Sequence, residues 1–61
     1  MDRKEFLERL EALLTDLPED DRRDALDYYQ GYLDEAGENT AKVLEELGSP
    51  EELADFIRSG L

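Results

Sequence analysis

The stretch Leu47-Gly48-Ser49-Pro50-Glu51-Glu52-Leu53-Ala54 ends one predicted helix and begins the next within two residues. Gly48 can adopt the left-handed backbone conformation that ends a helix without a steric penalty. Ser49 can accept a backbone N–H at the next helix start, and Pro50 fits the first helical position, where its missing N–H is not needed. Glu52 lies three residues after Ser49 and can reach back to it, which completes a capping box. We therefore expect a sharp structural corner between two helices.

Apolar residues on both sides of this corner recur at helical spacing, and no segment shows the alternation of a strand. Pro18 disfavours helical geometry at Leu17, so the first helix should stop by there. The expected helices run from about Arg3 to Thr15, from Pro18 or Glu19 to Gly37, from Asn39 or Thr40 (with Asn39 as the cap) to Leu47, and from Pro50 to about Arg58. The sequence thus predicts an all-α fold, with residues 1–61 as a single compact domain. Its four helices surround a leucine-rich core, and the last two are short and joined by the Gly-Ser-Pro corner.

The chain is small and strongly acidic. Its 61 residues carry 18 acidic and 7 basic side chains, which gives a formal net charge of -11. A charge of this sign opposes binding to nucleic-acid phosphates and to anionic lipid, and it favours a basic partner. Cysteine and histidine are both absent from the sequence, which excludes disulfides, thiolate metal sites and histidine general bases. No stretch approaches the roughly 18 apolar residues of a membrane span, so we expect a soluble acidic module.

The second helix has two distinct faces. Its inward stripe is expected to contain Ala25, Leu26, Tyr29, Tyr32, Leu33 and Ala36, and the opposite face collects Asp20, Asp24, Asp27 and Asp34. Gly31 lies in the middle of this acidic face, where a helical glycine costs roughly 1 kcal/mol relative to alanine. The presence of glycine at this position therefore needs a reason, such as close approach of another backbone or a local bend in the helix. Two interpretations of the acidic face stay open: it docks a basic surface, or it is a solvated face.

Three tyrosines lie close together in the same helix. Their spacing favours Tyr29 and Tyr32 as core residues with hydroxyl groups at the surface. Tyr28 lies at the edge of the apolar stripe, where core and surface positions are equally open. The alternative is that the tyrosines form an interaction hot spot. The candidate partner-binding residues are therefore Asp20, Asp24, Asp27, Tyr28 and Asp34.

The sequence offers no residue set typical of catalysis or of a cofactor site. Carboxylates are plentiful, but a glycosidase-like pair needs a cleft and a raised pKa, whereas these acids fall on predicted outer faces where water keeps them ionised. Residues 34–39 lack the alternating ligands and the twelfth-position glutamate of an EF-hand. There is no phosphate-binding glycine loop, and Arg22-Arg23, the one basic pair, stands among acids. We expect no enzyme, no metal or other cofactor, and no direct nucleic-acid contact.

An ordered set of motifs resembles a known family along essentially the whole chain. The second helix and the corner both carry part of the resemblance. The motifs are Lys4-Glu5-Phe6-Leu7-Glu8-Arg9-Leu10, Leu17-Pro18-Glu19-Asp20-Asp21-Arg22, Tyr28-Tyr29 through Tyr32-Leu33-Asp34-Glu35-Ala36-Gly37, and Val43 to Leu47 followed by Gly48-Ser49-Pro50-Glu51-Glu52-Leu53-Ala54. Together they are similar to the HAAS domain, an alpha-helical signalling domain associated with PadR-type transcription regulators.

The resemblance implies signalling without catalysis. Domains of this family typically lie at the cytoplasmic N-terminus of bacterial membrane proteins, ahead of transmembrane helices, and are thought to couple a membrane signal to a PadR-like winged-helix regulator. Nothing membrane-spanning follows Leu61, so the chain is either a domain excised from a longer membrane protein, which we expect, or a free-standing version of the domain. The alternative function is a structural or self-association module of a membrane protein, with no regulator partner. The family contributes no catalytic or ligand-binding residues.

Overall fold

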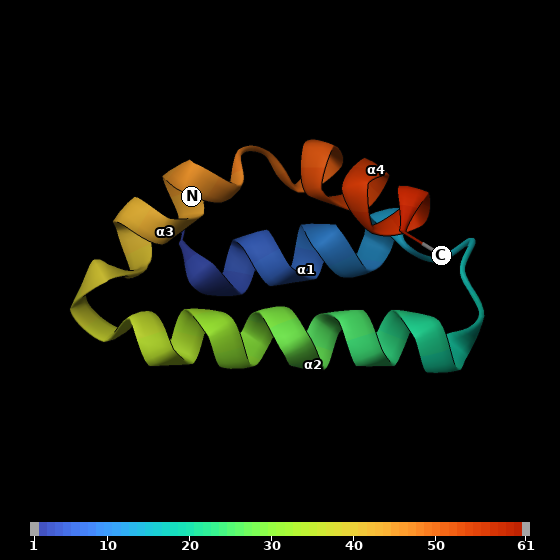
Figure 1. The fold of residues 1–61 in the computed structure, drawn as a ribbon, viewed down its shortest axis with the longest axis horizontal. Coiled ribbons are helices and arrows are strands. Elements are labelled where there is room, and N and C mark those ends of the chain that lie inside the picture. The colour runs from blue at the N-terminus through green and yellow to red at the C-terminus, as the bar shows by residue number, and fades with distance from the viewer. Residues whose placement is uncertain (1, 61) are drawn as a thin grey trace.

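The computed structural model describes residues 2–60, and every regular element in that range is helical (Figure 1). The elements are α1 (Arg3–Leu13), α2 (Glu19–Ala36), the 3-10 helix η1 (Gly37–Asn39), α3 (Thr40–Leu47) and α4 (Pro50–Ser59). The predicted all-α class is confirmed. The expectation of four separate helices is wrong in detail, because η1 joins α2 to α3 without a break. Residues 2–60 therefore contain three continuous helical stretches, and the middle one changes direction at Gly37, where φ is +54°.

Helix α1 is the central element of the fold. The long helix α2 runs along one side of α1, whereas α3 and α4 follow one another along its other side (Figure 1). Helix α1 contacts α2, α3 and α4, and α2 packs against α1 and α3. The outer side of α2 therefore faces away from the rest of the described chain.

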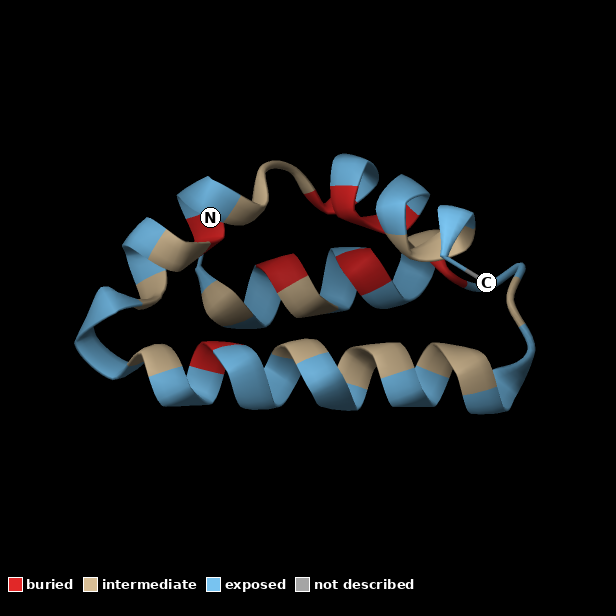
Figure 2. Cartoon of the chain, in the orientation of Figure 1, coloured by how far each residue is buried: buried red, intermediate tan, exposed pale blue. Residues whose placement is uncertain are grey.

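The core lies around α1 because its apolar stripe is enclosed from both sides. Figure 2 shows the buried positions on the parts of the helices that face the middle of the molecule. The buried apolar residues are Phe6, Leu10, Leu14, Leu33, Leu44, Leu53 and Ala54. Three of the seven come from α1 and its C-terminal cap, and Leu33 is the one that α2 contributes. Burying a leucine side chain is worth about 1.5–3 kcal/mol, so α1 carries a large share of the stabilising contacts.

The predicted corner between α3 and α4 is present, with one change to its hydrogen bonds. The Ser49 hydroxyl accepts the backbone N–H of Glu52 at 3.1 Å and donates to the Glu52 carboxylate at 3.3 Å. In a complete capping box the carboxylate would accept the backbone N–H of Ser49 instead. Pro50 is the first residue of α4 and is fully buried. Gly48 has the expected positive φ, +82°, and its ψ of -149° gives an extended conformation that is essentially restricted to glycine.

The start of α3 differs from the sequence prediction. Asn39 precedes the helix, but its side chain makes no capping bond. Its backbone angles, φ -91° and ψ 10°, are not the extended ones of a typical N-cap, because η1 continues helical geometry into α3. The hydroxyl of Thr40 instead donates to the carbonyl oxygens of Gly37 at 2.6 Å and of Leu33 at 3.4 Å. Thr40 thus ties the first turn of α3 to the end of α2.

Arginine side chains link the helices at the surface. Arg58 of α4 donates to the backbone carbonyl of Leu13 and to the carboxylate of Asp16, the latter at 3.1 Å. Arg9 of α1 pairs with Glu51 of α4 at 2.9 Å. The hydrogen bond from Arg58 holds the pKa of Asp16 below its ordinary value. Water and salt screen exposed pairs of this kind, so they orient the helices more than they stabilise them.

Candidate functional site

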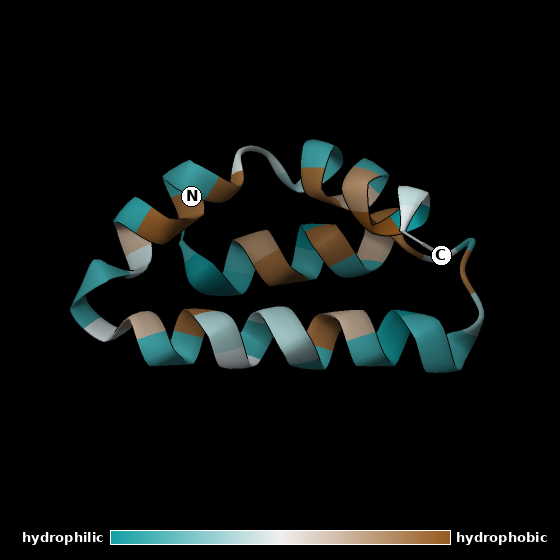
Figure 3. Cartoon of the chain, in the orientation of Figure 1, coloured by the Kyte–Doolittle hydropathy of each residue, from teal (hydrophilic) through white to brown (hydrophobic). Residues whose placement is uncertain are grey.

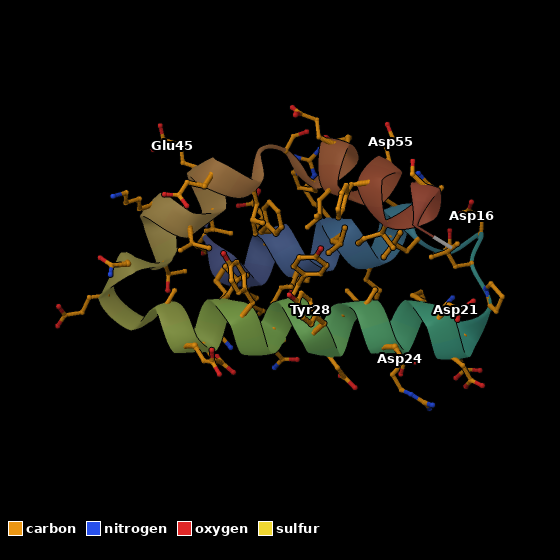
Figure 4. The ribbon with its side chains drawn as sticks, in the orientation of Figure 1. Asp16, Asp21, Asp24, Tyr28, Glu45 and Asp55 are labelled. Atoms are coloured by element: carbon orange, nitrogen blue, oxygen red, sulfur yellow. The ribbon has the colours of Figure 1, made fainter. Side chains whose placement is uncertain are left out.

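The five predicted partner-binding residues all lie on α2 with exposed side chains. Figure 4 shows Asp24 on the side of α2 that faces away from α1. Two of the four aspartates already have partners within the domain: Asp20 pairs with Arg23 at 3.2 Å, and Asp34 pairs with Arg3 of α1. Asp24 and Asp27 make no ion pair within residues 2–60. The acidic face therefore has an uncompensated centre between two partly neutralised ends.

The tyrosines lie differently from the sequence prediction. Tyr32 was expected in the core, but 43% of it is exposed, and Tyr28 is 65% exposed. The prediction for Tyr32 is wrong because the main contacts of α2 within residues 2–60, with α1, α3 and η1, leave the flank that carries Tyr32 exposed. Tyr29 is half-buried against the core, and its burial raises the pKa of its hydroxyl above 10.0, with a smaller contribution from the neighbouring tyrosines.

The three rings form a small aromatic cluster on the side of α2. Tyr28 and Tyr29 meet edge to face, with ring centroids 4.9 Å apart. The rings of Tyr28 and Tyr32 are nearly parallel, with an interplanar angle of 5° and a centroid separation of 6.4 Å. Tyr28 therefore stands between two other rings, at the edge of the acidic face.

Gly31 is an exposed residue in the interior of α2. A Cβ atom built on Gly31 meets no heavy atom within 4 Å. Close approach of another backbone within residues 2–60, one of the two reasons expected for this glycine, is therefore not the explanation. The helix loses about 1 kcal/mol here relative to alanine without an internal contact in return.

Most of the acidic side chains have no positive partner in the fold. Ion pairs among residues 2–60 involve five of the 18 acidic residues and four of the seven basic ones. This leaves 13 acidic side chains against three basic ones. Figure 3 shows the resulting hydrophilic band along the outer side of α2. The field around the domain is strongly negative and attracts positively charged partners.

The HAAS family model matches residues 5–55 of the chain, which is well over half of it. The chain belongs to the HAAS family. The comparison with curated proteins found no match, and the comparison with solved structures found none either. The residues of this HAAS domain that match the family model include all of α2 and the corner at residues 48–52. The resemblance of the sequence to this family is thereby confirmed.

The surface of the HAAS domain contains one further exposed aromatic residue. Phe56 of α4 is 70% exposed, because the inner side of that helix is taken by Leu53, Ala54 and Ile57. The sequence marks Phe56 only as one of the apolar residues of its helix. Its offset from the other three on a helical wheel is the signal for an outward position. Phe56 lies just beyond the residues that match the family model.

Neither a metal centre nor a membrane-spanning helix is found among residues 2–60 of this HAAS domain. No three potential metal-ligating side chains gather closely enough to hold an ion. No helix in this range combines the length and the apolar character that a bilayer span requires. The exposed features described above are the acidic face, the tyrosine cluster and Gly31, all on α2, together with Phe56 on α4.

Proposed function

We propose that this HAAS domain is a non-catalytic signalling domain that binds a PadR-like transcription regulator and couples it to a membrane protein at the cytoplasmic face of the membrane. Membership of the HAAS family supports this proposal. The observation that carries it is the excess of 13 acidic over three basic side chains outside internal ion pairs. A surface of this kind speeds association with a basic protein and selects against acidic ones.

The acidic face of α2 is the proposed contact region. Asp24 and Asp27 form its centre, because they are exposed and have no ion-pair partner within residues 2–60. Asp20 and Asp34 lie at its ends and contribute less, since each already pairs with an arginine of the domain. The regulator is expected to present lysine or arginine side chains to this face.

Co-purification with the PadR-like regulator tests the proposal. The double variant Asp24→Lys, Asp27→Lys is compared with Glu45→Lys, Glu46→Lys, which makes the same charge change on exposed residues of α3 (Figure 4 labels Asp24 and Glu45). We expect the α2 variant to bind the regulator more weakly and with less dependence on salt, and the α3 variant to bind as the unmodified domain does. Failure of the unmodified domain to bind the regulator at low salt would contradict the proposed function. Equal loss in both variants would show that the interface does not centre on α2.

Self-association is the second candidate function. It is favoured by three exposed large side chains, Tyr28, Tyr32 and Phe56, which offer apolar area to a second copy. The net charge of -11 opposes it, because two copies repel each other at low salt. Sedimentation equilibrium over a range of protein and salt concentrations decides between the two. A mass that rises with concentration, most clearly at high salt, would support the self-association module.

A further inference from the structure

The exposed glycine of α2 is surrounded by a specific set of side chains. Residues three and four positions away are the nearest neighbours on a helix surface. For Gly31 these neighbours are Asp27, Tyr28, Asp34 and Glu35, and all four are exposed. We call Gly31 and these four residues the Gly31 surface. It is a position without a side chain, bordered by one aromatic ring and three carboxylates.

No atom of residues 2–60 approaches the glycine at the centre of this surface closely. Its Cβ would point into open space, and φ at Gly31 is not positive, so alanine fits the position without strain. Glycine in the middle of a helix is useful where another backbone approaches closely. Because nothing within residues 2–60 does so, the open position at Gly31 is available to a backbone from outside the domain.

The chemistry around Gly31 indicates the kind of group that binds there. Asp27 and Glu35 make no ion pair within residues 2–60, and Asp34 pairs with Arg3. Tyr28 exposes 65% of its surface and is held in place by Tyr29, edge to face, and by the parallel ring of Tyr32. A flat guanidinium group can stack on a tyrosine ring while it donates hydrogen bonds to a carboxylate, whereas an ammonium group is a point charge that stacks less well.

We propose that the Gly31 surface docks an arginine-bearing helix of a basic protein partner, with the partner backbone close to Gly31 and a guanidinium stacked on Tyr28. This rests on the proposed function and deepens it, because it names the surface and the side chain through which the partner is recognised. The opposite charges of the two partners bring them together. The ring of Tyr28 then favours arginine over lysine, and the missing side chain at Gly31 lets the partner backbone pack closely.

Titration of the 61-residue chain with two synthetic helical peptides tests this inference. One peptide carries arginine at positions one turn apart, and the other carries lysine at the same positions. Amide chemical shifts locate the binding site, and calorimetry measures the affinity. We expect shifts centred on residues 27–35 and a preference for the arginine peptide of about two- to fivefold, the size of one exposed cation–π contact.

Three substitutions separate the contributions. Tyr28→Leu keeps apolar area but removes the ring, and it should abolish the preference for arginine. Gly31→Gln fills the gap in the surface without harming the helix, because glutamine is a better helix former than glycine, and it should weaken binding of both peptides. Ala41→Gln makes a comparable enlargement at an exposed position on α3 and should leave binding unchanged.

Two results would overturn the inference. One is equal affinity for both peptides that Tyr28→Leu and Gly31→Gln leave unchanged, which reduces the interaction to diffuse charge. The other is a set of chemical shifts centred on α3 or α4. If the regulator binds the domain but Gly31→Gln has no effect, this inference fails and the proposed function stands. If no regulator binds but the arginine peptide behaves as expected, the proposed function fails and the Gly31 surface serves another basic partner.

Discussion

Replacing Gly31 by alanine should stabilise the domain. The substitution adds a methyl group that meets no heavy atom within 4 Å, at a helical position whose φ is not positive. The full difference in helix propensity between glycine and alanine, about 1 kcal/mol, is therefore gained. A chain of 61 residues has a total stability of about 3–9 kcal/mol, so this single methyl group adds between a tenth and a third of the whole.

Gly37 provides a matched control within the same chain. A Cβ atom on Gly37 also meets nothing within 4 Å, so the two substitutions do not differ in crowding by other residues. They differ in the backbone, because φ at Gly37 is +54° with ψ -118°. A residue with a side chain is strained there by about 1–3 kcal/mol, which outweighs its gain from a less flexible unfolded chain. Gly37→Ala should therefore destabilise the domain.

Urea denaturation followed by circular dichroism at the helix band measures both effects. The midpoint should rise for Gly31→Ala and fall for Gly37→Ala, with unchanged slopes. In thermal unfolding, 1 kcal/mol corresponds to a shift of about 4–8 °C for a domain of this size. A fall in stability for Gly31→Ala, or shifts of the same sign for both variants, would refute the reasoning that only the backbone conformation separates these glycines.

Three further substitutions test the core, the corner and the link between α1 and α4. Leu10→Ala removes a fully buried side chain at a cost of about 2–5 kcal/mol, so most of the stability is lost and the amide NMR spectrum should lose its dispersion. Ser49→Ala removes the bond to the backbone N–H of Glu52 and should lower the urea midpoint by an amount equivalent to about 1 kcal/mol. Arg58→Gln should bring the pKa of Asp16 back towards its ordinary value of 3.8. The folded-state pKa of Asp16 is lowered, so Asp16 contributes its full stabilisation above its ordinary pKa of 3.8. This stabilisation is lost as the pH falls through the lower pKa of the folded state. The variant should therefore lose less stability on acidification than the unmodified domain, and equal losses in urea titrations near neutral pH and below pH 3.8 would contradict this role of Arg58.

The positions of the helices were largely predictable because local signals specify them. The leucine spacing, Pro18 and the Gly-Ser-Pro corner each act within a few residues. Helix α1 ends at Leu13, two residues before the predicted Thr15, and α4 begins at Pro50 as predicted. The join between α2 and α3 was less predictable. Gly37 ends α2 as predicted, but the sequence does not predict that η1 follows directly or that Thr40 links α2 to α3.

The candidate site was predictable only in part, because exposure depends on which helices cover which flank. The four aspartates of the acidic face are exposed as expected, since ionised carboxylates stay in water. Tyr32 is the clear failure. Its spacing fits the apolar stripe, but the contacts of α2 with its neighbours in residues 2–60 leave the flank with Tyr32 exposed. The internal partner of Asp34 was also unpredictable, because its arginine, Arg3, comes from α1.

The central position of α1 determines when the domain can fold during its own synthesis. The ion pairs that join α1 and its following turn to α4, Arg9 with Glu51 and Asp16 with Arg58, each span 42 residues. At about 5–20 residues per second, the ribosome needs roughly 2–8 seconds to make the chain between these partners. An isolated helix of 11 residues is marginally stable in water. During this interval α1 therefore lacks the packing contacts that α4 later provides. The nascent chain therefore carries an exposed leucine stripe until its last helix emerges, and chaperone capture is most effective within that interval.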